Sequence, residues 1–240
     1  MWSICKKELK QFFSNLTGYI AIILFLLING VFLFILTDSS LLDSGYATLD
    51  AFFSLAPWVL LFLVPAISMR SLSDEFKAGT FEILKTRPLS SWQIVTGKYV
   101  AILIVIVFVI IPTFLYIYTI RSLSTSGNID SGGIMGSYLG LFLLASLFAA
   151  ISLCCSSFTS NAVVAFLISA FACLILYFGF SALSKLNVFR GNADYYIEML
   201  GIDFHYRSIS RGVVDTRDII YFLSVILFSL LVTVKNLDKK

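Results

Sequence analysis

Charged residues are scarce in this sequence. Asp, Glu, Lys and Arg make up 13% of its 240 residues, about half their share in an average soluble domain. Hydrophobic residues make up 59%, and they gather in runs long enough to cross the hydrocarbon core of a bilayer, which is about 30 Å thick. The formal net charge of +3 is too small to indicate a nucleic-acid-binding protein. We therefore expect an integral membrane protein that lies in a lipid bilayer and has no nucleic acid among its partners.

The sequence also lacks the motifs of several kinds of chemistry. No GxxxxGKS or GxxxxGKT motif is present, so the chain has no phosphate-binding loop of its own for ATP. The single histidine, His205, has no cysteine or second histidine near it that would complete a metal site. The four cysteines show no disulfide pattern, and we interpret them as small buried side chains. We expect no catalytic residue, no metal site and no bound cofactor in this chain.

Six apolar runs predict transmembrane helices. They cover residues 18–36, 51–69, 99–120, 134–158, 162–183 and 219–234. None of them contains Asp, Glu, Lys, Arg or His, which argues against a proton relay, an ion pump or an intramembrane hydrolase. The sequence thus indicates an all-α integral membrane protein, with residues 1–240 forming a single transmembrane domain.

Two further segments are expected to lie along the membrane surface. In residues 1–16, apolar side chains recur at helical spacing opposite a face of lysines, which predicts an amphipathic helix in the membrane interface. The long connection at 184–218 contains apolar stretches and is expected to form interfacial helices on the external side. Basic residues are concentrated near both termini and in residues 70–98, so the positive-inside rule places these three parts in the cytoplasm.

Residues 70–98, RSLSDEFKAGTFEILKTRPLSSWQIVTGK, form a polar segment between two of these runs. The first part predicts a helix that continues inward from the second span and stops at Gly79, because glycine often follows a helix end. A second short helix follows and is closed by Pro88. Ser90 and Gln93 have the spacing of a capping box that starts the helix of the third span. These residues alone predict a cytoplasmic elbow, whose simplest interpretation is a solvated connector.

The stretch DEFKAGTFEILKTRPLSSWQIVTGK is similar to the segment that follows the second span in ABC-2-type permeases of ABC transporters. The matching positions are Glu75, Gly79, Thr80, Glu82, Leu84, Pro88 and Lys98. The amphipathic N-terminal helix, the six spans and the long connection before the sixth also resemble that family. Together with FHYRSISRGVVDTRDIIYFLSVILF, the same stretch resembles more narrowly the permease subunits associated with gliding motility in bacteria.

This resemblance implies a function. Such a permease is a multi-pass subunit of the bacterial cytoplasmic (inner) membrane, with both termini in the cytoplasm. It couples transport, here expected to be export, to ATP hydrolysis by a separate cytoplasmic ABC ATPase subunit, which is expected as a homodimer. A second permease-type subunit, identical or different, is expected to complete the complex. By the same resemblance, residues 70–98 would be the coupling segment that docks in a cleft of the ATPase.

The resemblance also implies which residues make that contact. The expected ATPase-coupling interface consists of Glu75, Phe76, Gly79, Thr80, Phe81, Glu82, Leu84, Pro88 and Lys98. Glu75 and Glu82 would pair with basic residues of the ATPase, while the aromatic and aliphatic side chains would fill apolar pockets as anchors.

Three residues within the spans have two open interpretations. Asn29 lies in the middle of the first span and should face protein, either bonding to another helix or lining a substrate path. Gly136 and Gly140 have the small-xxx-small spacing of close helix contacts, either within the chain or with a second subunit. The sequence leaves both questions undecided.

Two other functions are compatible with the sequence. A membrane scaffold, or a force-transmitting anchor for a cytoplasmic ATPase, would need the elbow but no transport path. A membrane-embedded enzyme that modifies lipids would need a nucleophile or an acid–base pair at the interface. For such chemistry, the ionisable side chains of residues 211–218 are those of Asp and Arg only.

Overall fold

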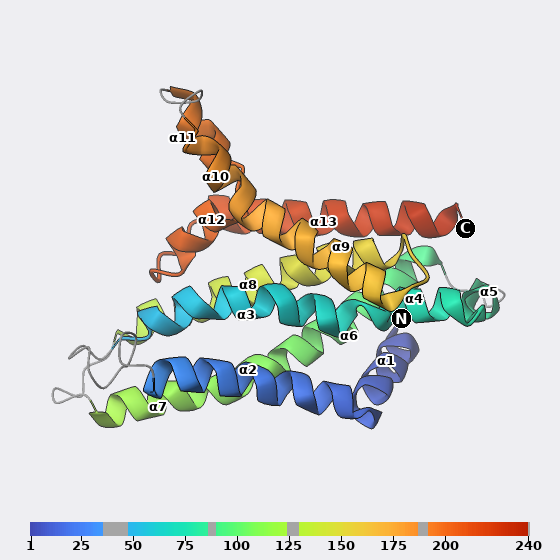
Figure 1. Cartoon of the computed structure of the whole chain (residues 1–240), viewed down its shortest axis with the longest axis horizontal. Helices are drawn as coiled ribbons and strands as arrows, with labels where there is room; N and C mark the ends of the chain where they lie inside the picture. The colour runs from blue at the N-terminus through green and yellow to red at the C-terminus, as the bar shows by residue number, and fades with distance from the viewer. Residues whose placement is uncertain (36–47, 86–89, 124–129, 187–191, 240) are drawn as a thin grey trace.

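The structure, a computed structural model, describes residues 1–35, 48–85, 90–123, 130–186 and 192–239. The regular secondary structure of these residues is helical and includes no strand, which confirms the all-α class. The long helices lie side by side along one axis of the molecule (Figure 1). Each helix begins and ends as follows.

The helices of the first half are α1 (Trp2–Ser14), α2 (Leu16–Phe34), α3 (Asp50–Ser68), α4 (Arg70–Lys77), α5 (Thr80–Lys85), α6 (Ser91–Ile110), the 3₁₀ turn η1 (Ile111–Thr113) and α7 (Phe114–Leu123). Those of the second half are α8 (Ser131–Ser156), α9 (Ala162–Leu174), the π-helical turn η2 (Ile175–Gly179), α10 (Phe180–Ser184), α11 (Asn192–Met199), α12 (Ile202–Ile209) and α13 (Thr216–Asp238). Both termini lie at the same end of the bundle as α4 and α5, and α11 projects at the other end (Figure 1).

Five helical units among the described residues are long and apolar enough to cross a membrane. They are Asp50–Lys77, Ser91–Ser122, Ser131–Ser156, Ala162–Ser184 and Thr216–Asp238. The sixth expected span is α2, which passes the same test only together with α1, from which it bends by 70°. The bend lies at Asn15, whose backbone is extended (φ −102°, ψ 142°). As a result, α1 lies across the end of the bundle while α2 runs along it (Figure 1).

The helix of the third expected span starts earlier than its apolar run. A capping box begins α6, because the Gln93 N–H donates to Ser90 Oγ and the Ser90 N–H donates to Gln93 Oε1, both at 3.3 Å. The expected capping residues are thus confirmed. Since α6 already has more than two turns before residue 99, Lys98 belongs to this helix and not to the connector, and its side chain is buried in the bundle.

The centre of the bundle is α8, which packs against α3, α6, α9 and α13. In an apolar stretch of 18 residues of α8, 72% is buried, whereas the corresponding share in the unit Ala162–Ser184 is 28%. A Cβ on Gly140 would lie 2.5 Å from Ile209 Cγ2, and a Cβ on Gly136 would lie 2.8 Å from the carbonyl oxygen of Gly212. These two α8 glycines therefore lie close to the end of α12 and to the segment that follows it in the same chain.

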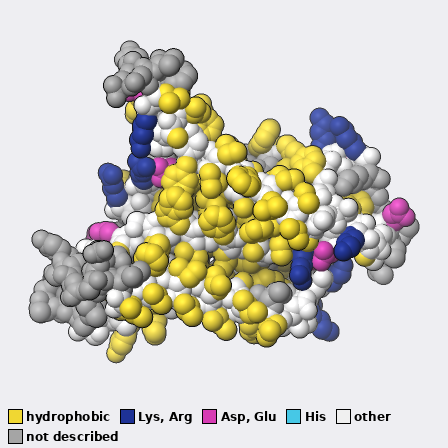
Figure 2. Space-filling view, in the orientation of Figure 1, with side chains coloured by type: hydrophobic (Ala, Val, Ile, Leu, Met, Phe, Trp, Pro, Cys, Tyr) yellow, Lys and Arg dark blue, Asp and Glu magenta, His cyan; other side chains and the backbone are white. Residues whose placement is uncertain are grey.

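Hydrophobic side chains form a broad band across the middle of the face shown in Figure 2, and Lys and Arg side chains lie toward its ends. On the surface as a whole, large apolar side chains such as Phe171 of α9 and Phe228 of α13 are exposed. Apolar side chains are stable in contact with apolar lipid tails, and a helix also satisfies its backbone hydrogen bonds internally. The surface therefore fits a bilayer with one aqueous phase at each end.

Candidate functional site

The elbow between α4 and α5 depends on one glycine. The last turn of α4 closes with hydrogen bonds from the Ala78 N–H to the Asp74 carbonyl (2.9 Å) and from the Gly79 N–H to the Phe76 carbonyl (3.3 Å). Gly79 then takes φ = +68°, a left-handed conformation that costs other residues about 1–2 kcal/mol. The chain turns there into α5, so Gly79 ends the helix as the sequence predicts.

A lysine is buried at the base of this elbow. Lys98 of α6 has a fully buried side chain (0% exposed). Its ammonium nitrogen donates hydrogen bonds to Glu8 Oε1 of α1 (2.7 Å) and to the Ser71 carbonyl oxygen of α4 (2.6 Å). The same nitrogen lies 2.9 Å from Glu75 Oε2, also in α4. Lys98 thus makes two hydrogen bonds and one further charge contact, the ion pair with Glu75 Oε2, and all three oxygens come from two other helices.

The carboxylate of Glu75 is shared between two lysines. Its second oxygen, Oε1, accepts a hydrogen bond of 2.9 Å from Lys7 Nζ of α1. We call Lys7, Glu8, Glu75 and Lys98 the ion cluster. When all four are ionised the cluster has two positive and two negative charges, and buried charges are tolerated only when they are paired in this way. The ion cluster thus joins α1, α4 and α6.

This arrangement corrects the expected role of two residues. Glu75 and Lys98 were expected to contact the ATPase, but they are only 8% and 0% exposed. Each charge is already neutralised by an opposite charge in the same chain. We therefore reassign Glu75 and Lys98 from contacting a partner to holding the elbow against α1 and α6.

The other half of the ion cluster, Lys7 and Glu8, was not among the expected site residues. These residues reach the site because Gly97 lets α1 lie close to α6: a Cβ on Gly97 would lie 3.2 Å from Ile4 Cβ. Two features of the sequence could have indicated the pairing. Glu8 is the only acidic residue of α1, and Lys98 directly precedes an apolar run.

A hydroxyl group joins the elbow to the central helix. Ser156, the last residue of α8, donates a hydrogen bond to the Met69 carbonyl oxygen (3.1 Å). Its oxygen also accepts from the backbone N–H groups of Leu72 (3.3 Å) and Ser73 (3.2 Å) at the start of α4. The elbow is therefore fixed at its base to α1, α6 and α8.

The tip of the elbow is the part that remains open to a partner. Its exposed members from the expected interface are Gly79, Thr80 and Glu82. Phe81 is 5% exposed and packs edge-on against Phe76, with ring centroids 5.1 Å apart, so it holds α5 against α4 instead of anchoring a partner. Two expected members lie outside what the structure describes, the Leu84 side chain and Pro88.

Asn29 of α2 is fully buried, so it faces protein as expected. Its Nδ2 donates a hydrogen bond of 2.8 Å to the Phe25 carbonyl one turn earlier in the same helix, and Oδ1 has no hydrogen-bond donor among the described residues. The expected bond to another helix is therefore not seen in the described part of the chain. Asn29 also does not line the apolar cavity described below.

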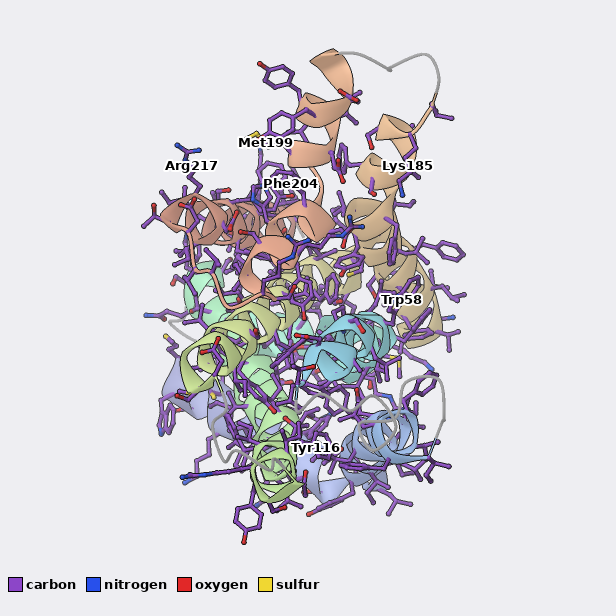
Figure 3. The ribbon with its side chains drawn as sticks, turned by 90° about the vertical axis from the view of Figure 1, so that its left-hand side faces the viewer. Trp58, Tyr116, Lys185, Met199, Phe204 and Arg217 are labelled. Atoms are coloured by element: carbon purple, nitrogen blue, oxygen red, sulfur yellow. The ribbon has the colours of Figure 1, made fainter. Side chains whose placement is uncertain are left out.

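A second polar cluster lies at the opposite end of the bundle, where Figure 3 labels Met199 and Arg217. His205 Nδ1 lies 2.7 Å from Asp218 Oδ1, and Nε2 lies 2.8 Å from the Met199 carbonyl oxygen. Both ring nitrogens of His205 are engaged, so neither is open to act as a general base on a lipid.

Asp215, in the same region, caps α13. Its carboxylate accepts a hydrogen bond from the Arg217 N–H (3.0 Å), and this bond lowers the pKa of Asp215 below its usual value. These contacts hold α12 and the start of α13 in place. No group of Asp, Glu, His or Cys residues in the described part of the chain could hold a metal ion.

A family model described as "ABC-2 family transporter protein" matches residues 2–194, which is most of the chain and includes α1, the elbow and the ion cluster. A comparison with curated proteins found no match. Members of the family are generally non-enzymatic membrane components. The chain is a multi-pass membrane protein with five to six candidate spans, and it belongs to the ABC-2 family of transporter proteins.

Proposed function

We propose that this chain is the permease subunit of an ABC transporter, and that it couples ATP hydrolysis by a separate cytoplasmic ATPase subunit to movement of a substrate across the membrane. Membership of the ABC-2 family supports the permease role. The coupling role rests on one observation: the elbow is exposed at its tip and fixed at its base to three helices. An element of this kind can pass a displacement at its tip into the bundle.

In the proposed mechanism the tip, with Glu82 at its exposed surface, docks in a cleft of the ATPase. When the ATPase changes shape on hydrolysis, it displaces α4. The ion cluster carries α1 and α6 along with α4, because opposite charges attract strongly in a low-dielectric interior and are costly to separate there. Ser156 carries the displacement into α8 at the centre of the bundle. The helices then move as linked rigid elements.

The proposed complex lies in the bacterial cytoplasmic (inner) membrane, with both termini and the elbow in the cytoplasm. It contains two copies of the ATPase subunit and a second permease-type subunit, either identical to this chain or different. Export, and a role in gliding motility, belong to the proposal through the sequence resemblance stated above. The positions of both termini and the elbow at one end of the bundle support the proposed topology (Figure 1).

Co-purification with the ATPase tests the coupling role. We expect Glu82→Lys to reduce the amount of ATPase subunit retained in mild detergent by about tenfold, because charge reversal at a docking surface adds repulsion. The variant should still fold, since Glu82 is exposed. The control is Glu198→Lys, a charge reversal on α11 at the opposite end, which should retain the wild-type amount. Wild-type retention by Glu82→Lys would show that the tip is not the docking site.

A scaffold without transport would retain the ATPase equally well. ATP hydrolysis by the complex in proteoliposomes separates the two functions. For a permease we expect hydrolysis that depends on the elbow and rises when a transported substrate is added. For a scaffold we expect normal assembly with no response to any substrate.

A further inference from the structure

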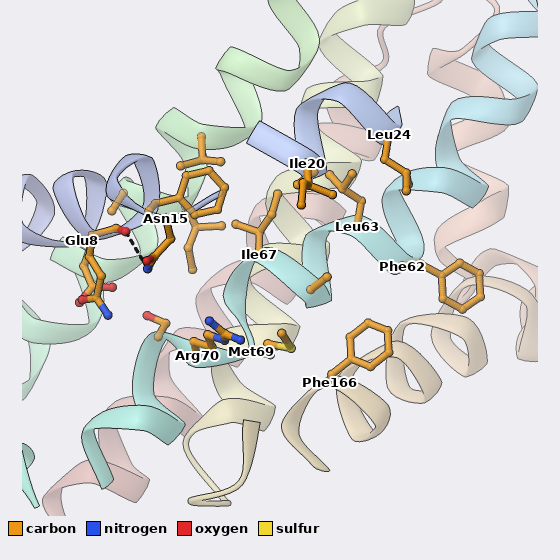
Figure 4. A pocket seen from close by; sticks show the side chains of 18 of the residues that line it. Glu8, Asn15, Ile20, Leu24, Phe62, Leu63, Ile67, Met69, Arg70 and Phe166 are labelled. Carbon is orange, nitrogen blue, oxygen red and sulfur yellow. Dashed lines mark hydrogen bonds between the residues drawn. The ribbon is translucent and has the colours of Figure 1, made fainter. Parts of the chain in front are cut away.

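An apolar cavity of about 560 Å³ lies between α1, α2 and α3, with α6 and Phe166 of α9 completing its wall (Figure 4). Its volume is within the range of about 300–1,000 Å³ that is typical of small-ligand sites. Along the spans its lining is apolar and includes Leu24, Phe62 and Leu63. This part of the cavity can hold a hydrocarbon chain.

Polar side chains line only one end of the cavity. They come from α1, from the residue that follows it and from the start of α4, and they are Glu8, Gln11, Asn15, Arg70 and Ser71. Figure 4 shows Glu8, Asn15 and Arg70 at this end, while Leu24 and Phe62 lie toward the other. The cavity therefore changes from polar to apolar along its length, as an amphiphilic ligand does.

The charge that has no ion-pair partner among the described residues at the polar end is positive. Glu8 is neutralised by Lys98 at 2.7 Å. Arg70 is exposed and forms no ion pair with any residue in the described ranges. A guanidinium group binds a phosphate through two parallel N–H···O bonds. An anionic head group is the complement of this end.

We propose that the cavity binds one anionic phospholipid from the bilayer leaflet nearest the elbow, with an acyl chain between α2 and α3 and the phosphate at Arg70. The source of the ligand is the bilayer, because Ile20, Leu24, Trp58 and Phe62 line the cavity and are also exposed on the apolar surface of the bundle. A lipid can enter sideways through this opening without crossing water.

The lipid site adjoins the ion cluster. Glu8 belongs to both, and Arg70 precedes Ser71, whose carbonyl oxygen accepts a hydrogen bond from Lys98. A bound lipid would fill the space between α1 and α3 and thereby stabilise the position of α1. The inference rests on the cavity and its charge, so it stands or falls independently of the proposed ATPase contact.

Native mass spectrometry of the full chain in detergent, with phosphatidylglycerol or phosphatidylcholine of identical acyl chains, tests the inference. We expect wild-type protein to bind one phosphatidylglycerol with a Kd about tenfold lower than that for phosphatidylcholine. Arg70→Gln should remove this preference. Ala66→Trp should abolish binding of both lipids, because Ala66 lines the cavity from an exposed position on α3. Lys77→Gln, an exposed cation on α4 outside the cavity lining, should behave as wild type.

Two results would overturn the inference. Equal Kd values for the two lipids in the wild type, or a preference that survives Arg70→Gln, would show that Arg70 does not select a lipid by the negative charge of its head group. Binding that Ala66→Trp leaves unchanged would show that the lipid lies elsewhere on the surface. The two variants act on opposite features of the cavity, so either one gives a decisive result if the other fails to fold.

Discussion

Lys98→Met is expected to lower the free energy of unfolding by about 3–5 kcal/mol, because removing one partner of a buried ion pair leaves the other charge unpaired. The variant leaves two buried carboxylates, Glu8 and Glu75, with Lys7 as the only cation of the ion cluster. For a chain of this length the expected fall in melting temperature is about 10 °C. A thermal melt of the purified chain in detergent measures it.

Two further variants control for the loss of a lysine as such. Lys77→Met removes an exposed lysine of α4 and should change the free energy of unfolding by no more than about 0.5 kcal/mol. Lys98→Met combined with Glu8→Gln leaves the Lys7–Glu75 pair neutral, so it should recover part of the lost melting temperature. A double variant that melts below Lys98→Met would contradict the pairing of these charges.

Gly212→Ala is expected to cost about 3 kcal/mol of the free energy of unfolding, for two reasons that add. Gly212 has φ = +83°, where a side chain costs about 1–2 kcal/mol. An added Cβ would also clash with Gly133 Cα in the backbone of the central helix α8, and overpacking of this kind typically costs about 1–3 kcal/mol. The same thermal melt measures the change.

Gly79→Ala is the matched control for this second prediction. Gly79 also has positive φ (+68°), but an added Cβ would meet nothing within 4 Å. Its cost should therefore be the conformational part alone, about 1–2 kcal/mol. If the two variants melt at the same temperature, the contact between the segment after α12 and α8 is not as tight as the structure places it.

Local features of the sequence were sufficient to predict much of the fold. The apolar runs identified the long helices, Gly79 indicated the end of α4, and Ser90 with Gln93 indicated the start of α6. These features are readable because helix ends and apolar periodicity depend on residues a few positions apart. The elbow was predicted from the same kind of signal.

The ion cluster could not be predicted in this way, because its partners are far apart in the sequence. Glu8 is 90 residues from Lys98, and Lys7 is 68 residues from Glu75. Because each expected span contains no charged residue, the expected third span begins directly after Lys98, although α6 begins at Ser91. Glu75 and Lys98 form ion pairs within the chain and hold the base of the elbow. The tip of the elbow is the part that is exposed to a partner.

Site-specific photo-crosslinking in intact membranes tests most directly whether the elbow contacts the ATPase. A photo-reactive amino acid is placed at Glu82, on the exposed tip, or at Val213, which is exposed at the opposite end of the bundle. With the ATPase subunit co-expressed, we expect a crosslinked product from position 82 and none from position 213. A product from position 213 with none from position 82 would contradict both the cytoplasmic location of the elbow and its role in docking the ATPase.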